Sequence, residues 1–361
     1  MSSLELWGWN TFFEQQVDRH ASRTGRRLAW ARITEEQRGL YRIDGEVSGW
    51  AEVSGRFRHG AASAADFPAV GDWVGVAASE STSIIHVRLE RRSTISRAAA
   101  GPAAAEQIIA ANVDTIFLVT ALTQDLNPRR LERYLTMVWD AGAMPVVVLN
   151  KADLCDDPER ECAAIRARLP HVDVVAVSAL ADEGLPALSP YLRPVRTLAL
   201  LGMSGVGKST LVNRLMGDDC GAVQRVGEIR ESDGRGRHTT TSRQLVALPG
   251  GALLIDTPGM RELQLWSDES AVERAFDDIA SLARGCRFED CGHASEPGCA
   301  VLQAVVDGQL DDDRLANYRR LAREAAFEQR KRDKAGAAEL KRRWKHAAKA
   351  ARAMYRDRDR Q

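Results

Sequence analysis

Short apolar runs separated by polar or amphipathic segments fill the middle of the chain. Runs of this kind are typical of parallel strands that helices cover on both faces of a sheet. The pattern predicts strands at 114–120, 144–149, 172–177 and 198–201, and helices at 127–141, 158–169 and from 210 to 216. Two more runs, 244–248 and 252–255, flank Pro249–Gly251 and predict a hairpin. We therefore expect an α/β domain with a mostly parallel sheet.

The first hundred residues follow a different pattern. Residues 1–24 predict a helix with its approach, and short alternating stretches separated by glycines and polar turns follow from 27 to 95. A period of two predicts strands with one buried face. The clearest stretches are 41–44, 49–55, 71–76 and 83–88. Four or five strands in this length predict a small closed barrel such as an OB-fold, and the small residues of 98–106 predict a linker after it.

The run at 198–201 leads into a segment that fits the pattern G-x-x-x-x-G-K-[ST], from Gly202 to Lys208 and Ser209. Between a strand and a helix, such a loop wraps a polyphosphate with its backbone N–H groups, and the helix N-terminus adds positive potential. Lys208 is expected to reach the β- and γ-phosphates, and Ser209 to hold Mg²⁺. The expected nucleotide contacts of this loop are Gly202, Gly205, Val206, Gly207, Lys208, Ser209 and Thr210.

Three further motifs follow predicted strands: Asn150-Lys151-Ala-Asp153, Ser178-Ala179 and Asp256-Thr-Pro-Gly259. The carboxyl ends of strands form the ligand-binding face of open α/β sheets. A carboxylate at Asp153 can accept hydrogen bonds from both N1–H and N2–H₂ of guanine, a pair that adenine does not offer. Each motif is weak by itself, but together they resemble the signatures of a GTPase domain.

The resemblance implies roles for the other motif residues. Asn150 is expected to approach the N7/O6 edge of guanine, and Lys151 to pack against the base and the phosphate loop. The N–H of Ala179, beside Ser178, is expected to face O6. In the third motif, Asp256 is expected to hold Mg²⁺ through water, and the N–H of Gly259 to sense the γ-phosphate.

The order of the motifs is unusual. In a common GTPase the phosphate loop comes first, whereas here the guanine motifs at 150–153 and 178–179 precede it. A circular permutation preserves the sheet, because termini that lie close together can be joined while new ones open elsewhere. The part of the chain after Gly259 is then connected directly to the segment expected to respond to the γ-phosphate.

Residues 227–242 are polar and glycine-rich, which is typical of a mobile switch loop; a basic loop that contacts RNA is the other interpretation. Of its three consecutive threonines, Thr240 is favoured as a Mg²⁺ ligand. Many GTPases have a water-orienting Gln after the third motif, but this chain has Met260, which cannot orient water. His238 is the candidate for that task, so the expected catalytic residues are His238, Lys208 and Thr240.

Three cysteines and one histidine lie within fourteen residues, in the pattern C-x₄-C-x-H-x₅-C. Thiolate and imidazole ligands select zinc, and four protein ligands leave no open position, so we expect one structural Zn²⁺ ion. The alternative is a group of free cysteines with a chance histidine. The expected ligands are Cys286, Cys291, His293 and Cys299.

Arginine and lysine are concentrated in two regions. The predicted helices from 313 to 356 carry many of them, which suggests an acidic partner such as RNA; a solvated helix face is the alternative. The barrel combines arginines with aromatic residues, a combination found on RNA-binding faces, although the aromatics could equally be core. The barrel residues in question are Arg56, Arg58, Arg88, Arg91, Arg92, Arg97, Phe57, His59 and Trp73.

Composition limits the alternatives. The 361 residues are 44% hydrophobic, and no apolar run approaches the ~20 residues of a membrane helix. The N-terminus lacks the features of a signal peptide, so a cytoplasmic protein without a membrane partner is expected. In that compartment six cysteines do not indicate disulfides. Because Lys plus Arg and Asp plus Glu both number 50, contacts with nucleic acid must come from local patches.

The barrel, the permuted motifs, the zinc pattern and the basic tail together resemble the ribosome small-subunit-dependent GTPase A (RsgA/YjeQ) family. The resemblance implies an OB-like barrel at 1–100, a circularly permuted P-loop GTPase domain at 101–268 and a zinc-binding helical domain at 269–361. It implies a monomer that hydrolyses GTP to GDP, binds Mg²⁺ and Zn²⁺, and acts late in maturation of the small ribosomal subunit by binding 16S rRNA. Subunit binding is expected to stimulate hydrolysis.

Two alternatives differ in class. One is a P-loop kinase that transfers the γ-phosphate to a small molecule; the guanine motif at 150–153 argues against it. The other is a non-enzymatic RNA-binding assembly factor that uses GTP as a structural ligand. Stimulated hydrolysis separates this alternative from the GTPase.

Overall fold

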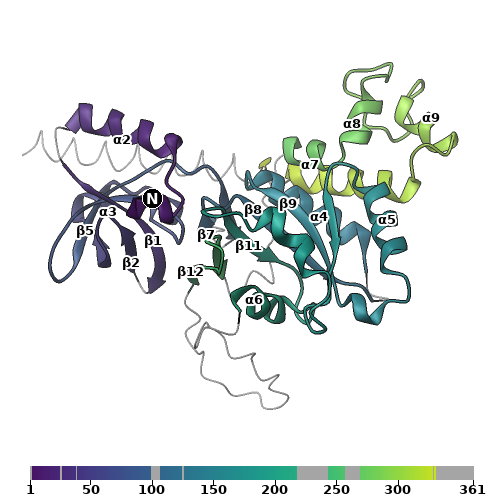
Figure 1. Ribbon diagram of the computed structural model, residues 1–361. Coiled ribbons are helices and arrows are strands. Elements are labelled where there is room, and N and C mark those ends of the chain that lie inside the picture. Colours follow the sequence, from purple (N-terminus) through teal and green to yellow (C-terminus); the bar gives the residue numbers. More distant parts are fainter. Residues whose placement is uncertain are drawn as a thin grey trace, which may run out of the picture. The chain divides into compact units, whose positions relative to one another are not determined.

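The computed structural model describes residues 2–24, 27–37, 39–98, 106–123, 126–217, 243–256, 269–327 and 329–330. The chain forms two compact units, residues 1–264 and 265–361 (Figure 1). Residues 227–242 with His238 and Thr240, then Gly259, Met260 and the basic tail beyond 330, lie outside the described residues. Among the helices that are described, none has both the length and the apolar character to cross a membrane.

Five strands close into a barrel in the first unit. Their order is β1-β2-β3-β5-β4, and β4 pairs back onto β1. The bounds are β1 (Ala29–Gln37), β2 (Leu40–Gly45), β3 (Gly49–Val53), β4 (Trp73–Ala77) and β5 (Ser83–Arg88). This confirms the predicted small barrel. The sequence pattern identified four of its strands but not β1.

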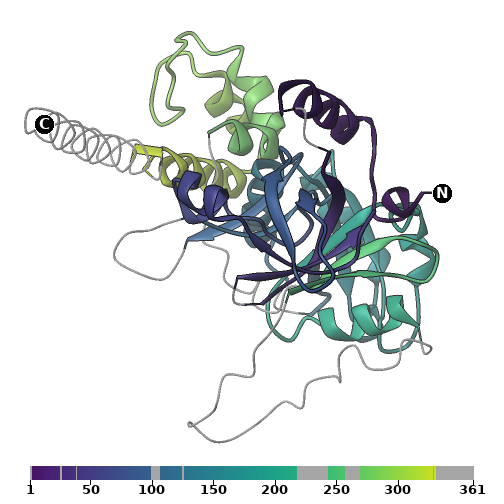
Figure 2. The ribbon, with the colours of Figure 1, turned by 90° about the vertical axis from the view of Figure 1, so that its left-hand side faces the viewer.

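The N-terminal segment packs against the barrel (Figure 2). It forms α1 (Ser3–Leu6) and α2 (Thr11–Thr24), which confirms the predicted helix. Phe13 of α2 is buried with Trp30 and Trp73 of the barrel. The Trp9 ring meets Trp73 edge-on at a centroid distance of 4.7 Å. Trp73 is therefore a core residue, covered by this aromatic cluster, so that of the two interpretations of the barrel aromatics the core one holds for Trp73.

Several of the barrel arginines form ion pairs or hydrogen bonds with neighbouring residues. Arg91 pairs with buried Asp72 at 2.7 Å and donates to two backbone oxygens of residues 65 and 67. Arg88 donates to the backbone oxygen of Leu89, at 2.9 Å. In contrast, α3 (Gly55–Gly60) has the sequence GRFRHG and exposes Arg56, Arg58 and His59. Of the predicted basic residues, those of α3 and Arg92 are exposed, and Arg92 lies 3.4 Å from the carboxylate of Asp114.

A second group of strands in this unit, continuous with the barrel strands, carries the predicted α/β pattern. Its order is β10-β9-β8-β11-β13-β12, with all neighbours parallel except β12, which is antiparallel to β13. The strands are β8 (Thr115–Ala121), β9 (Met144–Asn150), β10 (Asp173–Ala176), β11 (Thr197–Leu201), β12 (Arg243–Ala247) and β13 (Leu253–Asp256). The helices are α4 (Pro128–Asp140), α5 (Pro158–Arg168) and α6 (Lys208–Met216). These elements confirm the predicted strands, helices and hairpin.

A hairpin that was not predicted links the barrel to this sheet. Its strands are β6 (Thr94–Ala98) and β7 (Glu106–Ala111), paired from Thr94↔Ala111 to Ala98↔Glu106. The predicted linker thus begins and ends in paired strands, while residues 99–105 lie outside the described part of the chain. The small residues there hid the pairing, because they carry little hydrophobic signal.

The barrel and the α/β sheet share hydrogen bonds directly. Strand β1 pairs with β12 through Glu35↔Gln244 and Glu36↔Arg243, so that one continuous sheet runs from β10 to the barrel. The guanidinium of Arg243 also lies 3.6 Å from the carboxylate of Glu36. The two parts of this unit are therefore joined by backbone pairing and not only by the covalent chain.

Arg32 of β1 lies at this junction and is only 1% exposed. Its guanidinium donates to the backbone oxygens of Trp7, Gly71 and Asn112, at 2.6, 3.0 and 3.1 Å. It also donates to Oγ1 of Thr197 at 3.0 Å, and Thr197 is the first residue of β11. One side chain thus fastens the N-terminal segment, the barrel and the strand that leads into the phosphate loop.

The second unit is helical. It contains α7 (Glu269–Ala275), α8 (Asp277–Ala283), α9 (Ala300–Val306) and a helix over residues 312–327. Phe276 is fully buried, and the guanidinium of Arg314 stacks on its ring at 4.7 Å. Arg314 also donates to both carboxylate oxygens of Asp278, each at 2.7 Å. These contacts hold the predicted C-terminal helix against α8.

Arg32→Met is expected to lower the free energy of unfolding by about 3 kcal/mol or more, because the junction loses the four hydrogen bonds that the buried guanidinium donates. Burial lowers the pKa of Arg32 to about 10, against the opposing effect of Asp114 and Asp72, so the group remains charged at neutral pH. Urea denaturation followed by tryptophan fluorescence measures the change. The control is Arg42→Met on the exposed side of β2, expected to stay within about 0.5 kcal/mol; equal losses in both variants would contradict this role.

Candidate functional site

The glycine-rich loop lies where the sequence predicted it, between a buried strand and a helix. Every residue of β11 is buried, and β11 is flanked by β8 and β13. The loop from Gly202 to Gly207 follows, and α6 begins at Lys208. Met203, Ser204 and Gly205 are exposed. Backbone N–H groups and a helix N-terminus are thus presented at one open edge, which is the arrangement that binds phosphate.

Two glycines of the loop are required by close packing. At Gly202 a Cβ atom would lie 2.1 Å from the backbone oxygen of Val119 in β8. At Gly207, where φ is +93°, a Cβ atom would lie 2.2 Å from Nδ2 of Asn150. No other residue fits either position without displacing backbone or a buried amide. The loop therefore depends on β8 and β9 for its shape.

Lys208 is folded over the loop. Its ammonium group donates to the backbone oxygens of Gly202 and Met203, at 2.6 and 2.5 Å. Ser209 is exposed at the first turn of α6, and Thr210 follows it, partly buried. The cation and the hydroxyl therefore lie at the same helix end, beside the exposed part of the loop.

Asn150, the last residue of β9, is 2% exposed and connects two loops. Its Nδ2 donates to the backbone oxygen of Val206 at 2.8 Å, and its Oδ1 accepts from the N–H of Ala179 at 3.0 Å. The phosphate loop and the loop after β10 are therefore hydrogen-bonded to the same side-chain amide. The N–H of Ala179, expected to face guanine, is engaged with Asn150 here because the buried Oδ1 needs a donor.

Asp153 lies in a short 3₁₀ turn over Ala152–Leu154 and is exposed. Its Oδ1 accepts a 2.5 Å hydrogen bond from the hydroxyl of Ser178, which is fully buried. The hydroxyl in turn accepts from the N–H of Ala181 at 3.0 Å. Ser178 therefore orients the Asp153 carboxylate, and the other carboxylate oxygen is left toward solvent.

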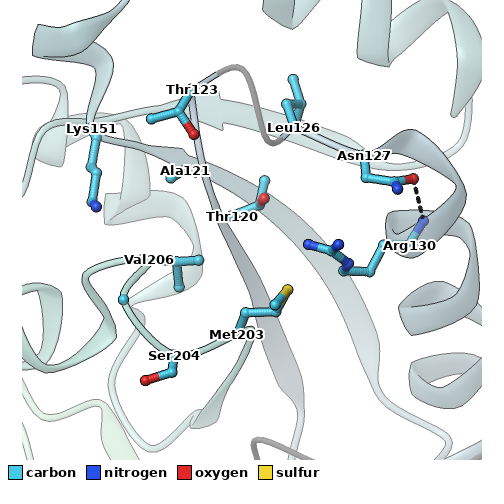
Figure 3. Close-up of a pocket in the computed structure, with 11 residues that line it drawn as sticks. Thr120, Ala121, Thr123, Leu126, Asn127, Arg130, Lys151, Met203, Ser204 and Val206 are labelled. Carbon is cyan, nitrogen blue, oxygen red and sulfur yellow. Dashed lines mark hydrogen bonds between the residues drawn. The ribbon is translucent and has the colours of Figure 1, made fainter.

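A pocket of about 700 Å³ opens beside the loop (Figure 3). Its walls are the loop residues 203–206, Lys151, the end of β8 and the start of α4. Lys151 adopts a left-handed backbone conformation, with φ of +63°, at the turn after β9. Asn127 and Arg130 also line the pocket. They were not identified from the sequence, since they belong to no local motif and reach the loop only through the fold.

Asp256 ends β13, next to the strand that precedes the phosphate loop. Burial raises the pKa of its carboxyl group. A buried carboxylate is stabilised by a divalent cation, so this position suits the predicted Mg²⁺ ligand. Its expected companions Thr240, Gly259 and the catalytic candidate His238 lie outside the described residues.

The second unit brings the predicted zinc ligands together. The ligand atoms of Cys286, Cys291, His293 and Cys299 all lie within 4.8 Å of one another. The Sγ atoms of Cys286 and Cys299 are 3.8 Å apart, and they lie 3.6 and 3.5 Å from Nδ1 of His293. A tetrahedral site with Zn–S of about 2.3 Å and Zn–N of about 2.0–2.1 Å requires separations of about 3.8 and 3.5 Å. The geometry therefore fits zinc.

The charges in this cluster also favour a cation. Burial opposes ionisation of Cys286, but the backbone N–H groups of Val301 and Ala300 outweigh it and lower the pKa of that thiol. Burial, together with the sulfurs of Cys299 and Cys286, raises the pKa of Cys291 to about 11. Three thiols at these distances cannot all ionise alone, and Zn²⁺ would supply the missing positive charge.

Glu296 organises the loop between the predicted zinc ligands, a role that no sequence motif indicated. Its carboxylate accepts hydrogen bonds from the N–H groups of Gly292, Ala294 and Ser295, at 3.0, 2.7 and 2.9 Å. Such bonds stabilise the charged form and lower its pKa to about 2. Since His293 lies between two of these donors, the carboxylate fixes the backbone that carries this ligand.

Comparison with known proteins agrees with this geometry. A model of the RsgA GTPase family matches residues 88–266. The chain is 45% identical over 368 residues to the small ribosomal subunit biogenesis GTPase RsgA of Opitutus terrae, an alignment that covers 98% of both chains. It is 51% identical over 267 residues to the protein of the same name from Methanosarcina acetivorans, covering 73% of this chain and 71% of the relative.

Two solved structures share the fold. YjeQ from Thermotoga maritima has a TM-score of 0.64 at 24% identity, over 82% of this chain and 98% of the other. YloQ, described as a circularly permuted GTPase, has a TM-score of 0.62 at 26% identity, over 84% of this chain and 97% of the other. The predicted fold, a barrel followed by a circularly permuted GTPase domain, is therefore confirmed.

Glu296→Ala is expected to release zinc about tenfold faster from the zinc-loaded protein, because partners behind the ligands typically change metal affinity 10–100-fold. A chromogenic zinc chelator measures the rate. The matched control is Glu289→Ala, which removes an exposed carboxylate from the same loop and is expected to leave the rate unchanged. Identical rates for the wild type and Glu296→Ala would show that the carboxylate does not support the site.

Proposed function

The chain belongs to the RsgA GTPase family of GTP-hydrolysing P-loop enzymes, and on that premise we propose that it acts late in maturation of the small ribosomal subunit, which stimulates its GTP hydrolysis. The names of the relatives support the partner. Binding to 16S rRNA is the finer part of the proposal. The exposed arginines Arg56 and Arg58 of α3 support it, as does the basic composition of the C-terminal segment.

One observation carries the nucleotide part of the proposal. The carboxyl ends of β9, β10, β11 and β13 bring the guanine, phosphate and Mg²⁺ motifs to one edge of the sheet. The amide of Asn150 links two of these motifs directly. Motifs that are dispersed along the chain thus form one site, as the parallel order of the strands requires.

For the base, Asp153 is the residue that selects guanine. With Oδ1 fixed by Ser178, the remaining carboxylate surface can accept N1–H and N2–H₂. Asn150 uses one amide hydrogen for Val206 and keeps the second for N7. Lys151 packs along the base from the αL turn. For the N–H of Ala179 to meet O6, it would have to exchange its bond to Asn150.

For the phosphates, the N–H groups of the loop and of the first turn of α6 form the cradle, from Gly202 to Thr210. Lys208 would leave the carbonyls of Gly202 and Met203 for the β- and γ-phosphates. Ser209, Asp256 and, from the sequence, Thr240 would hold Mg²⁺, which neutralises phosphate charge. His238 is proposed to position the attacking water, with Gly259 contacting the γ-phosphate.

Hydrolysis of GTP by the purified protein is expected to rise strongly with small ribosomal subunits and not with large ones. Lys208→Ala is expected to abolish it under both conditions, because the transferred phosphate loses its cation. Release of inorganic phosphate measures the rates. Equal slow rates with either subunit would contradict the proposed stimulation and favour GTP as a structural ligand. A phosphorylated small molecule as the product would indicate a kinase.

Asp153→Asn is expected to weaken GTP binding at least tenfold and to strengthen binding of XTP relative to GTP. The amide can donate to the carbonyl that xanthine carries at C2, where guanine has an amino group. Fluorescent GDP and XDP analogues measure both affinities. Asp156→Asn, an exposed acidic residue three positions along, is the matched control. Unchanged guanine preference in Asp153→Asn would remove Asp153 from the base site.

A further inference from the structure

The pocket beside the phosphate loop is built to receive negative charge (Figure 3). Among the eleven lining residues that the structure describes, none is acidic, whereas Lys151 and Arg130 are cations. The loop residues 203–206 form the facing wall. Because the described lining carries positive charge and no carboxylate, it favours binding of a polyanion in the pocket. Lys151 belongs to the guanine motif, but Arg130 has no role in the site as described so far.

Arg130 is held by a rigid element. It is the third residue of α4, a helix that starts with Pro128 and is capped by Asn127, whose Oδ1 accepts from the N–H of Arg130 at 3.3 Å. The next residue, Leu131, and Leu135 one turn later are 2% and 1% exposed, so the first turns of α4 are anchored in the core. The backbone of Arg130 is therefore fixed relative to β8 and the loop.

The side chain of Arg130 points into the pocket. Figure 3 shows its guanidinium reaching from α4 toward Thr120 and Met203, on the side opposite Lys151. Within the described residues, the guanidinium has no hydrogen bond or ion pair with an acidic group. Burial raises the pKa of the Tyr134 phenol, one turn along the helix, and the positive charges of Arg130 and Arg133 oppose that shift. A positioned cation with free N–H groups is available to a ligand on the loop.

We propose that Arg130 contacts the phosphate chain of bound GTP and stabilises the transition state of its hydrolysis, as a further catalytic residue that acts in cis beside the water-positioning role proposed for His238. The proposal rests on the proposed nucleotide site. In the reaction, water attacks the γ-phosphorus and the bond from that phosphorus to the β–γ bridging oxygen breaks. GDP leaves with the electron pair, and the protons of the water remain with inorganic phosphate and solvent. The guanidinium keeps its proton and binds the oxygens on which negative charge increases.

The chemistry favours Arg130 over the other cations for this task. Lys208 lies within the loop itself and donates to two of its carbonyl oxygens. It would therefore contact the phosphates from the side of the loop. A guanidinium approaching from outside presents parallel N–H groups to two phosphate oxygens, which a lysine cannot do.

The test uses the full-length protein and three variants. Arg130→Ala removes the cation, and Arg130→Lys keeps a point charge. Arg129→Ala is the matched control, since Arg129 is exposed on the same turn and does not line the pocket. Single-turnover GTP hydrolysis is measured with and without small ribosomal subunits. Binding of fluorescent GDP is measured with and without aluminium fluoride, which mimics the transferred phosphate.

Arg130→Ala is expected to slow hydrolysis at least tenfold in both conditions, while the affinity for GDP alone changes less than threefold. It is also expected to lose the tightening of GDP binding that aluminium fluoride produces. Arg130→Lys is expected to recover part of the rate, and Arg129→Ala to remain within twofold of the wild type. The unchanged GDP affinity shows that the variants are folded.

Three outcomes would overturn the proposal. Wild-type rates in Arg130→Ala would show that the guanidinium does not act on the phosphates. Full activity of Arg130→Ala at saturating GTP, with GTP and GDP bound equally weakly, would assign Arg130 to ground-state binding alone. Equal slowing in Arg129→Ala would indicate a general effect of helix charge. If the wild type itself failed to hydrolyse GTP, the proposed function would fail independently of Arg130.

Discussion

The buried amide of Asn150 is the interaction on which the nucleotide site depends. It donates to the backbone of Val206 and accepts from the backbone of Ala179, so one side chain fixes the phosphate loop and the loop after β10 in register. An unpaired buried amide costs about 1–3 kcal/mol, so neither partner can move away freely. The amide can approach the loop because Gly207 has no side chain.

The permuted chain builds this site without a change in the sheet. Parallel strands place every motif at the same edge whatever their order along the sequence. Strand β12 has two partners in this sheet, because it pairs with β13 on one side and with β1 of the barrel on the other. The barrel is thus hydrogen-bonded to the hairpin that ends in Asp256, and Arg32 ties it to the first residue of β11.

Each candidate site brings together groups that carry, or would carry on ionisation, charge of one sign. A ligand of the opposite charge would neutralise them. Beside the phosphate loop, Lys151 and Arg130 line a pocket whose described lining residues include no acidic one, and Lys208 binds the carbonyls of the loop itself. In the second unit, three cysteine sulfurs and an imidazole converge at zinc-like distances. Like charges held together are unfavourable until a counter-ion binds. A polyphosphate at the first site and a zinc ion at the second would therefore offset this repulsion.

The sequence by itself determined the α/β strands and the position of the glycine-rich loop, and it predicted the guanine motifs and the four zinc ligands. These signals are local: the ligands lie within a few residues of one another, and strands buried on both faces are apolar throughout. Only the tertiary structure decided the rest. Strand β1 escaped prediction because its buried positions include the polar residues Arg32 and Glu35, and the partners of Arg32 come from distant segments. Arg130 joined the pocket because α4 meets a loop more than seventy residues away in sequence. Periodicity reports which face of an element is buried, but it does not identify the partner that buries it.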